Sequence, residues 1–229
     1  MNEDVRSLDD FTGTARLFPL PGLVFFPQAV QPLHIFEPRY RQMLADALAT
    51  DRLLAMVLLR PNWEKNYEQR PAIEQVACLG RVVAEQLLPD GRSNLLLRGL
   101  ARVRLLEEVP TDKLYRSAKV EVLQDIYSPN LETLLNLRAR LTQEMLPFFS
   151  DSAIREQVRG LLTSEMPLGQ ICDMLAFSLP LTPVVKQQLL AETRVETRVE
   201  LLLAGFLGLV AKQAEPTTTS KFPPDFSEN

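Results

Sequence analysis

Histidine and cysteine, which often act as nucleophiles, general bases or transition-metal ligands, are scarce in this sequence. His34 is the only histidine, and Cys78 and Cys172 are the only cysteines. This excludes most histidine-based metal sites, and two isolated cysteines lack the paired spacing of a zinc site. We predict a hydrogen-bonded structural role for His34, with a catalytic histidine as the alternative. Both cysteines are expected to be buried, reduced thiols, the usual state in the cytoplasm.

The sequence contains no motif of the common catalytic classes. None of its nine glycines is followed by Lys, which excludes a Walker A loop, and neither G-x-G-x-x-G nor G-x-S-x-G occurs. The adjacent carboxylates of Glu107 and Glu108 would point to opposite faces of a strand, which is poor geometry for shared acid–base catalysis. We therefore predict no cofactor, no bound metal and no enzymatic activity.

Four arginines surround one predicted hairpin: Arg92, Arg98, Arg102 and Arg104. Arg102 and Arg104 would share a face, because alternate residues of a strand point the same way. One interpretation is a face that binds anions or RNA, and the other is a solvated face paired with neighbouring glutamates. We favour the second, because no aromatic residues interleave with the arginines and the net charge is −4.

The elements that would position these residues change in type near residue 126. Before it, apolar runs, prolines and the turn at Asp90-Gly91 predict strands, and Pro38 suits the first turn of a helix. The expected strands are residues 16–20, 29–36, 53–59, 73–88, 94–106 and 118–123, with a bulge or bend at Gly99. After it, helical spacing predicts a helix capped by Ser128 and helices over 152–163, 167–178, 183–191 and 194–212. Strands followed by helices indicate an α+β protein.

The two ends of the chain are polar. Residues 1–14 are expected to be a flexible leader, and the Pro-, Thr- and Ser-rich residues 213–229 a disordered tail. The leader lacks the chemistry of a signal peptide. The late apolar run at residues 201–210 is about half the length that spans a bilayer. We expect a cytoplasmic protein that makes no membrane contact.

One long segment resembles a known family. Residues 17–27 read Leu-Phe-Pro-Leu-Pro-Gly-Leu-Val-Phe-Phe-Pro, and residues 32–41 read Pro-Leu-His-Ile-Phe-Glu-Pro-Arg-Tyr-Arg. Together they resemble the opening of the Lon N-terminal domain, the substrate-recognition part of ATP-dependent Lon proteases in peptidase family S16. Residues 80–104 are similar to its central hairpin and residues 175–190 to its helical part.

The resemblance implies a PUA-like pseudo-β-barrel over residues 15–126, followed by an α-helical bundle over 127–212. It further implies a stand-alone substrate-binding domain without the ATPase and peptidase domains. Such a protein would bind unfolded or apolar polypeptide segments without catalysis, could deliver them to a protease, and could self-associate weakly through its helices. Because PUA-like barrels often bind RNA, the alternative function is RNA binding through the hairpin Arg98–Arg104. The net negative charge of the chain disfavours this alternative.

The resemblance directs attention to the aromatic residues as binding candidates. We expect Trp63 and Tyr67, in the polar loop 60–72, to be the best surface candidates, because exposed loops often carry binding residues. Phe36 and Tyr40 are further candidates, although core packing is the usual role of such side chains, and Trp63 could fold back onto the sheet.

Four residues match the family's motif closely: His34, Glu37, Arg39 and Arg41. We interpret their role as structural, with a direct substrate role as the alternative. Glu37 suits a helix N-terminus, where the helix dipole favours negative charge. The two arginines can clamp the β-domain through ion pairs.

Overall fold

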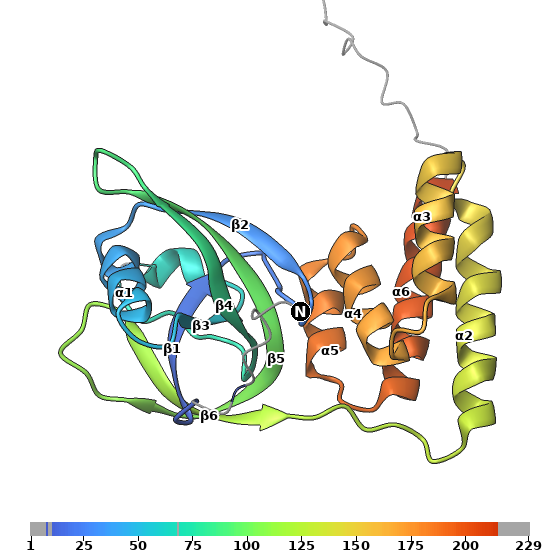
Figure 1. The fold of residues 1–229 in the computed structure, drawn as a ribbon, viewed down its shortest axis with the longest axis horizontal. Coiled ribbons are helices and arrows are strands. Elements are labelled where there is room, and N and C mark those ends of the chain that lie inside the picture. Colours follow the sequence, from blue (N-terminus) through green and yellow to red (C-terminus); the bar gives the residue numbers. More distant parts are fainter. Residues whose placement is uncertain (1–7, 9–10, 68, 215–229) are drawn as a thin grey trace, which may run out of the picture.

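The computed structural model describes residue 8, residues 11–67 and residues 69–214. Most of the predicted leader and the tail from residue 215 lie outside this part of the chain. The described residues confirm the α+β prediction, with a β-rich part followed by helices (Figure 1). The β-rich part contains β1 (Thr14–Leu20), β2 (Val30–Ile35), α1 (Pro38–Leu48), β3 (Leu53–Leu58), η2 (Trp63–Asn66), β4 (Val76–Leu87), β5 (Ser93–Val109) and β6 (Arg116–Leu123). The helical part contains α2 (Leu131–Met145), η3 (Leu146–Phe148), α3 (Ser152–Thr163), α4 (Leu168–Ser178), α5 (Pro183–Ala191) and α6 (Val195–Ala214).

The six strands form one sheet that closes on itself. The strand order is β2-β5-β4-β3-β1-β6, and β5 also pairs with β6, so five strands form a ring and β2 extends it at the edge of β5. β1 and β3 run parallel, and the other pairs are antiparallel. This ring is the pseudo-barrel predicted for the first half of the chain.

Two apolar cores lie on the two faces of this sheet. The first consists of small and branched residues: Ala15, Leu17, Leu53, Ala55, Val57, Ala77, Leu79, Val103, Ala118 and Val120. Because its members come from all five strands of the ring, this cluster fills the barrel interior. The second core joins the outer face of the sheet to α1 and to the helical part, which lie on opposite sides of the barrel (Figure 1). β3 is buried along its whole length because it contributes to both cores.

The bend predicted at Gly99 is present. The register between β4 and β5 shifts there, because Leu79 pairs with Ala101 whereas Gly80 pairs with Gly99. The segment before β2 crosses close to this point, and Gln28 N–H donates to the Gly99 carbonyl at 3.0 Å. A Cβ atom on Gly99 would overlap the carbonyl oxygen of Phe26. Only glycine therefore permits this close approach of two backbones.

The helical part packs around α6. The apolar stripe of α6 is buried at Val195, Val199, Leu202, Leu203 and Phe206. The predicted Ser128 cap is wrong, because α2 begins at Leu131 and Asn130 accepts the capping hydrogen bond from Glu132 N–H at 2.9 Å. Helix α6 continues to Ala214, two residues into the predicted tail. No helix in the described part of the chain combines the length and apolarity needed to cross a bilayer.

We predict that Gly99→Ala lowers the free energy of unfolding by about 3 kcal/mol, because the new methyl group displaces the segment before β2. Urea denaturation measures this change. The matched control is Gly160→Ala in α3, where nothing lies within 4 Å of the new Cβ and better helix propensity should add about 1 kcal/mol. Equal stabilities of the two variants would contradict the argument.

Candidate functional site

An open apolar groove lies where β2, β5 and β4 extend beyond the ring. Its volume is about 450 Å³. We call it the β2 groove, and it is lined by Pro32, Leu33, His34, Ala84, Glu85, Gln86, Asn94, Leu95 and Leu96. The only carboxylate among these, Glu85, accepts a hydrogen bond from the Ser93 hydroxyl at 3.1 Å. The lining contains no lysine or arginine, and its apolar residues Pro32, Leu33, Ala84, Leu95 and Leu96 suit an apolar occupant.

Phe36 stands at one end of the β2 groove. Its side chain is 57% exposed, and its ring stacks on His34 with centroids 6.1 Å apart. His34 is itself held, because its Nδ1 and the Asn94 Oδ1 are 2.7 Å apart. His34 therefore makes a hydrogen bond, as predicted, and its ring also supports the exposed ring of Phe36.

The free edge of β2 is blunted. Ala29 accepts a hydrogen bond from Gly99 on β5, so by the alternation of an antiparallel ladder the backbone groups of Pro32 face away from β5. Pro32 has no N–H to donate, and the Gln31 side chain donates to the Pro32 carbonyl at 2.9 Å. Proline and carbonyl capping both oppose the addition of another strand at this edge.

The predicted loop candidates lie beside the start of α1. Trp63 and Tyr67 are half-buried and pack edge to face, with ring centroids 5.4 Å apart. The Tyr67 hydroxyl donates to Glu37 Oε1 at 2.7 Å, and Arg39 pairs with the same carboxylate at 2.7 Å while stacking on the Tyr67 ring. Burial and the bond to Glu37 raise the pKa of Tyr67. Glu37 therefore connects the loop to the helix.

Tyr40 differs from these residues in its burial, although the Arg39 guanidinium also lies over its ring. It is a core residue, whose hydroxyl donates to the Pro19 carbonyl at 3.0 Å and whose ring packs edge to face on Phe18. Burial raises its pKa strongly. Tyr40 is therefore not available to a ligand at the surface. Arg41 places its guanidinium beside Gly91 in the hairpin turn.

The four hairpin arginines do not form one face. Arg92 pairs with Asp90 in the turn at 2.5 Å, and Arg104 pairs with Glu121 at 3.2 Å on the exposed surface. Arg98 is half-buried. Arg102 is only 3% exposed and points into the helical part. The expectation that Arg102 and Arg104 lie together on an exposed face is wrong, because Arg102 is buried and only Arg104 is exposed.

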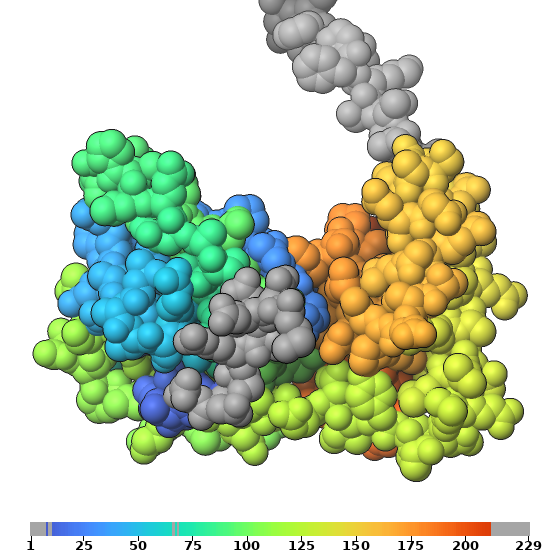
Figure 2. Space-filling view, in the orientation of Figure 1, coloured from blue at the N-terminus to red at the C-terminus, as the bar shows by residue number. Residues whose placement is uncertain are grey.

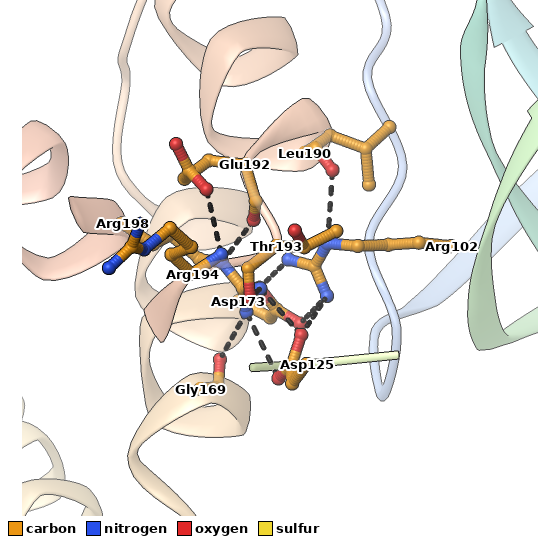
Figure 3. Close-up of polar contacts among 9 residues, drawn as sticks. All are labelled: Arg102, Asp125, Gly169, Asp173, Leu190, Glu192, Thr193, Arg194 and Arg198. Atoms are coloured by element: carbon orange, nitrogen blue, oxygen red, sulfur yellow. Dashed lines mark hydrogen bonds and ion pairs between the residues drawn. The ribbon is translucent and has the colours of Figure 1, made fainter. Parts of the chain in front are cut away.

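Arg102 belongs to a buried ion-pair network that joins the barrel to the helices (Figure 3). It forms a two-pronged pair with Asp173 of α4, one prong at 2.8 Å, and its Nε donates to the Leu190 carbonyl at 3.0 Å. Arg198 of α6 pairs with Asp125 at 2.5 Å and with Asp173 at 3.3 Å. Burial raises the pKa of Asp173, and the two arginines oppose that rise. We call these four residues the buried network.

Sequence reasoning missed the buried network, although a signal for it was present. Arg198 interrupts the apolar stripe of α6 next to Val199, and Asp173 follows the buried residues Ile171 and Cys172 in α4. A charged residue at a core position of a helix needs a partner of opposite charge. The sequence does not reveal which residue that partner is.

Neither cysteine is placed as a reactive thiol in the described part of the chain. Both cysteines are free and buried. Burial raises the pKa of Cys78, and that of Cys172 to about 12, which keeps both thiols protonated and unreactive near neutral pH. Among the described residues, no group of three or more His, Cys, Asp or Glu side chains could hold a metal ion.

Comparison with known proteins gives consistent matches. The family model of the ATP-dependent protease La (LON) substrate-binding domain matches residues 14–204. The chain is 31% identical to the Lon protease of Heliobacterium modesticaldum over 192 residues, which are 81% of this chain and 23% of that protein. It is 25% identical to the Lon protease of Dictyoglomus thermophilum over 206 residues, 86% of this chain and 24% of that protein. The chain thus spans about a quarter of the length of these relatives.

Two solved structures share the fold. The crystal structure of a Lon N-terminal domain protein from Xanthomonas campestris is 26% identical, with a TM-score of 0.59, and the match covers 83% of this chain and 97% of that one. The N-terminal domain of the Mycobacterium avium complex Lon protease gives a TM-score of 0.67 at 14% identity, covering 83% and 96%. At that identity the second likeness concerns the fold alone.

We predict that Arg198→Met lowers the free energy of unfolding by about 3–5 kcal/mol, because the buried Asp173 and the half-buried Asp125 each lose one of their arginine partners. Chemical denaturation measures the loss. Arg140→Met is the matched control, since Arg140 pairs with Glu144 and Glu200 on the exposed surface and such pairs contribute little. A similar small effect for both variants would contradict the role given to the buried network.

We predict that Glu37→Ala loosens the Trp63 loop, because Tyr67 and Arg39 both lose their acceptor. The expected loss of stability is about 1–2 kcal/mol. Trp63 is the only tryptophan, so acrylamide quenching of its fluorescence reports the loop directly and should increase. Glu64→Ala, an exposed change in the same loop, should leave quenching unchanged. Equal quenching in the wild type and Glu37→Ala would show that Glu37 does not hold the loop in place.

Proposed function

This chain belongs to the Lon substrate-binding domain family, and we propose that it is a non-catalytic module that binds unfolded or apolar segments of other polypeptides. The family match covers most of the chain. The sequence carries none of the catalytic motifs considered above, and the matched region corresponds to about a quarter of the Lon proteases compared. Binding without catalysis is the activity that these observations support best.

The β2 groove with Phe36 is the observation that carries this proposal. Two large apolar side chains are exposed here: Leu96 in the lining, at 39%, and Phe36, which stacks on the lining residue His34, at 57%. Contiguous exposed apolar surface commonly marks a site of protein–protein contact. The groove volume lies within the range of pockets that bind compact ligands. It can therefore accept a few apolar side chains of an extended segment.

The mode of recognition follows from the blunted edge of β2. Because Pro32 and Gln31 oppose strand addition, the bound segment would be held by its side chains and not by a continuous ladder of backbone hydrogen bonds. The amide groups of Gln86 and Asn94 at the groove can still donate to or accept from single peptide groups. Such a site selects apolar character and tolerates many sequences.

Two further parts of the proposal concern partners. The bound polypeptide would pass to a protease, since the relatives compared are Lon proteases. RNA is not the ligand we propose, because Arg102 is buried and paired with Asp173, and the net charge of the chain is −4.

The loop that carries Trp63 and Tyr67 would contribute to polypeptide binding through the exposed part of its two aromatic rings.

Binding is tested by titrating the full chain with a permanently unfolded, carboxymethylated protein and following the anisotropy of a label on that protein. We expect saturable binding that Phe36→Ala weakens about tenfold, or about 1.4 kcal/mol, because aromatic side chains are often hot spots of binding surfaces. Leu131→Ala is the control, since Leu131 is comparably exposed but lies on α2.

Two outcomes would contradict the proposal. No saturable binding to the unfolded protein would reject the function itself. Saturable binding that responds equally to Phe36→Ala and Leu131→Ala would reject the β2 groove as its site. A parallel titration with single-stranded RNA should show no binding, and tight RNA binding would favour the alternative function.

A further inference from the structure

A second apolar groove lies on the helical part, far from the β2 groove. We call it the α6 groove, and it is lined by Phe148, Phe149, Leu179, Pro180, Phe206, Leu209 and Val210. Its volume is about 380 Å³. Neither the ion pairs of the buried network nor the proposed polypeptide site uses any of these residues.

Aromatic rings form one wall of the α6 groove. Phe149 stacks on Phe206 with ring centroids 6.1 Å apart, and Phe148 packs edge to face on the same ring at 5.5 Å. Phe148 is 48% exposed, whereas Phe206 is buried beneath it. A hollow lined by partly open phenylalanine rings is the kind of surface that binds proline-rich and aromatic segments.

The chain itself contains a segment of that chemistry close by. Residues 221–226 read Lys-Phe-Pro-Pro-Asp-Phe. Two successive prolines favour the extended polyproline II conformation, which costs little entropy to bind. Phe222 and Phe226 flank the prolines and supply two rings. We propose that residues 222–226 bind in the α6 groove of the same molecule.

The connecting chain is long enough for this contact. Helix α6 ends at Ala214, about 6 Å beyond Val210 at the helical rise of 1.5 Å per residue. Residues 215–221 can span about 23 Å when extended, which exceeds the distance back to the groove lining on α6. A short tether also raises the effective concentration of the segment to about the millimolar range, so a weak intrinsic affinity suffices.

Charge supports the same occupant. Arg155 of α3 lies beside the groove, where its Nε donates to the Phe149 carbonyl at 2.6 Å. A guanidinium carries five N–H donors, so Arg155 can also donate to a carboxylate. Asp225 lies between the prolines and Phe226 in the tail and gives the proposed occupant a charge opposite to that of Arg155. Docking would also cover the exposed Phe148 ring, which removes an aggregation-prone surface.

The proposal is tested on the full chain by methyl and aromatic NMR. We expect nuclear Overhauser effects between the ring protons of Phe222 and Phe226 and the methyl groups of Leu209 and Val210. The double substitution of Phe222→Ala with Phe226→Ala should remove them and shift the Leu209 and Val210 methyl resonances. The control is Thr217→Ala with Thr218→Ala in the connecting chain, which should change neither.

Arg155→Gln provides a second measurement on a chain with an intact tail. It should reduce the docked population several-fold without moving resonances of the β2 groove. Absence of the contacts in the wild type, or identical groove methyl shifts in the wild type and the double alanine variant, would overturn the proposal. Contacts that disappear on tenfold dilution would also overturn it, because they would come from the tail of a second copy.

Discussion

The buried network is the constraint on which the arrangement of the two parts depends. Its four charged residues come from β5, from the connection after β6, from α4 and from α6. Charges are costly to bury, and their mutual attraction offsets that cost only when geometry and hydrogen bonding are good. Each of the four therefore tolerates little displacement of the others. We infer that the network contributes to the orientation of the two parts more than to net stability, because a well-packed apolar set in its place could be equally stable.

Strand β5 connects this constraint to the candidate binding surface. Its residues after the bulge carry Arg102 into the helical part, and its residues before Gly99 pair with β2 and line the β2 groove. The bulge changes which face each side chain occupies. One strand can thus bury a charge toward the helices at one end and present Asn94 and Leu96 to solvent at the other. The close approach of the Phe26 carbonyl at Gly99 holds the bend between these two regions.

The two apolar grooves are suited to different occupants. The β2 groove is open, mostly uncharged and bordered by a strand edge that discourages backbone pairing, which suits transient contact with varied apolar segments. The α6 groove is aromatic and lies near the end of the last helix, which suits a proline-rich segment of the same chain. Figure 2 shows the β-rich and helical parts as separate lobes, with the connection between them at one side. The grooves lie on different lobes, so occupancy of one leaves the other sterically accessible.

The sequence by itself determined the types of the elements, the α+β order and the family, because turn residues, helix spacing and motif identity are local properties. Helix α5 begins and ends where the pattern predicted, at Pro183 and Ala191. The tertiary structure alone decided which side chains are available. Arg102 is buried because Asp173, 71 residues away, meets it, and Tyr40 is in the core because Phe18 packs on it. The β2 groove likewise needs three strands whose residues span 32 to 96. Exposure depends on neighbours distant in sequence, and no local pattern encodes them.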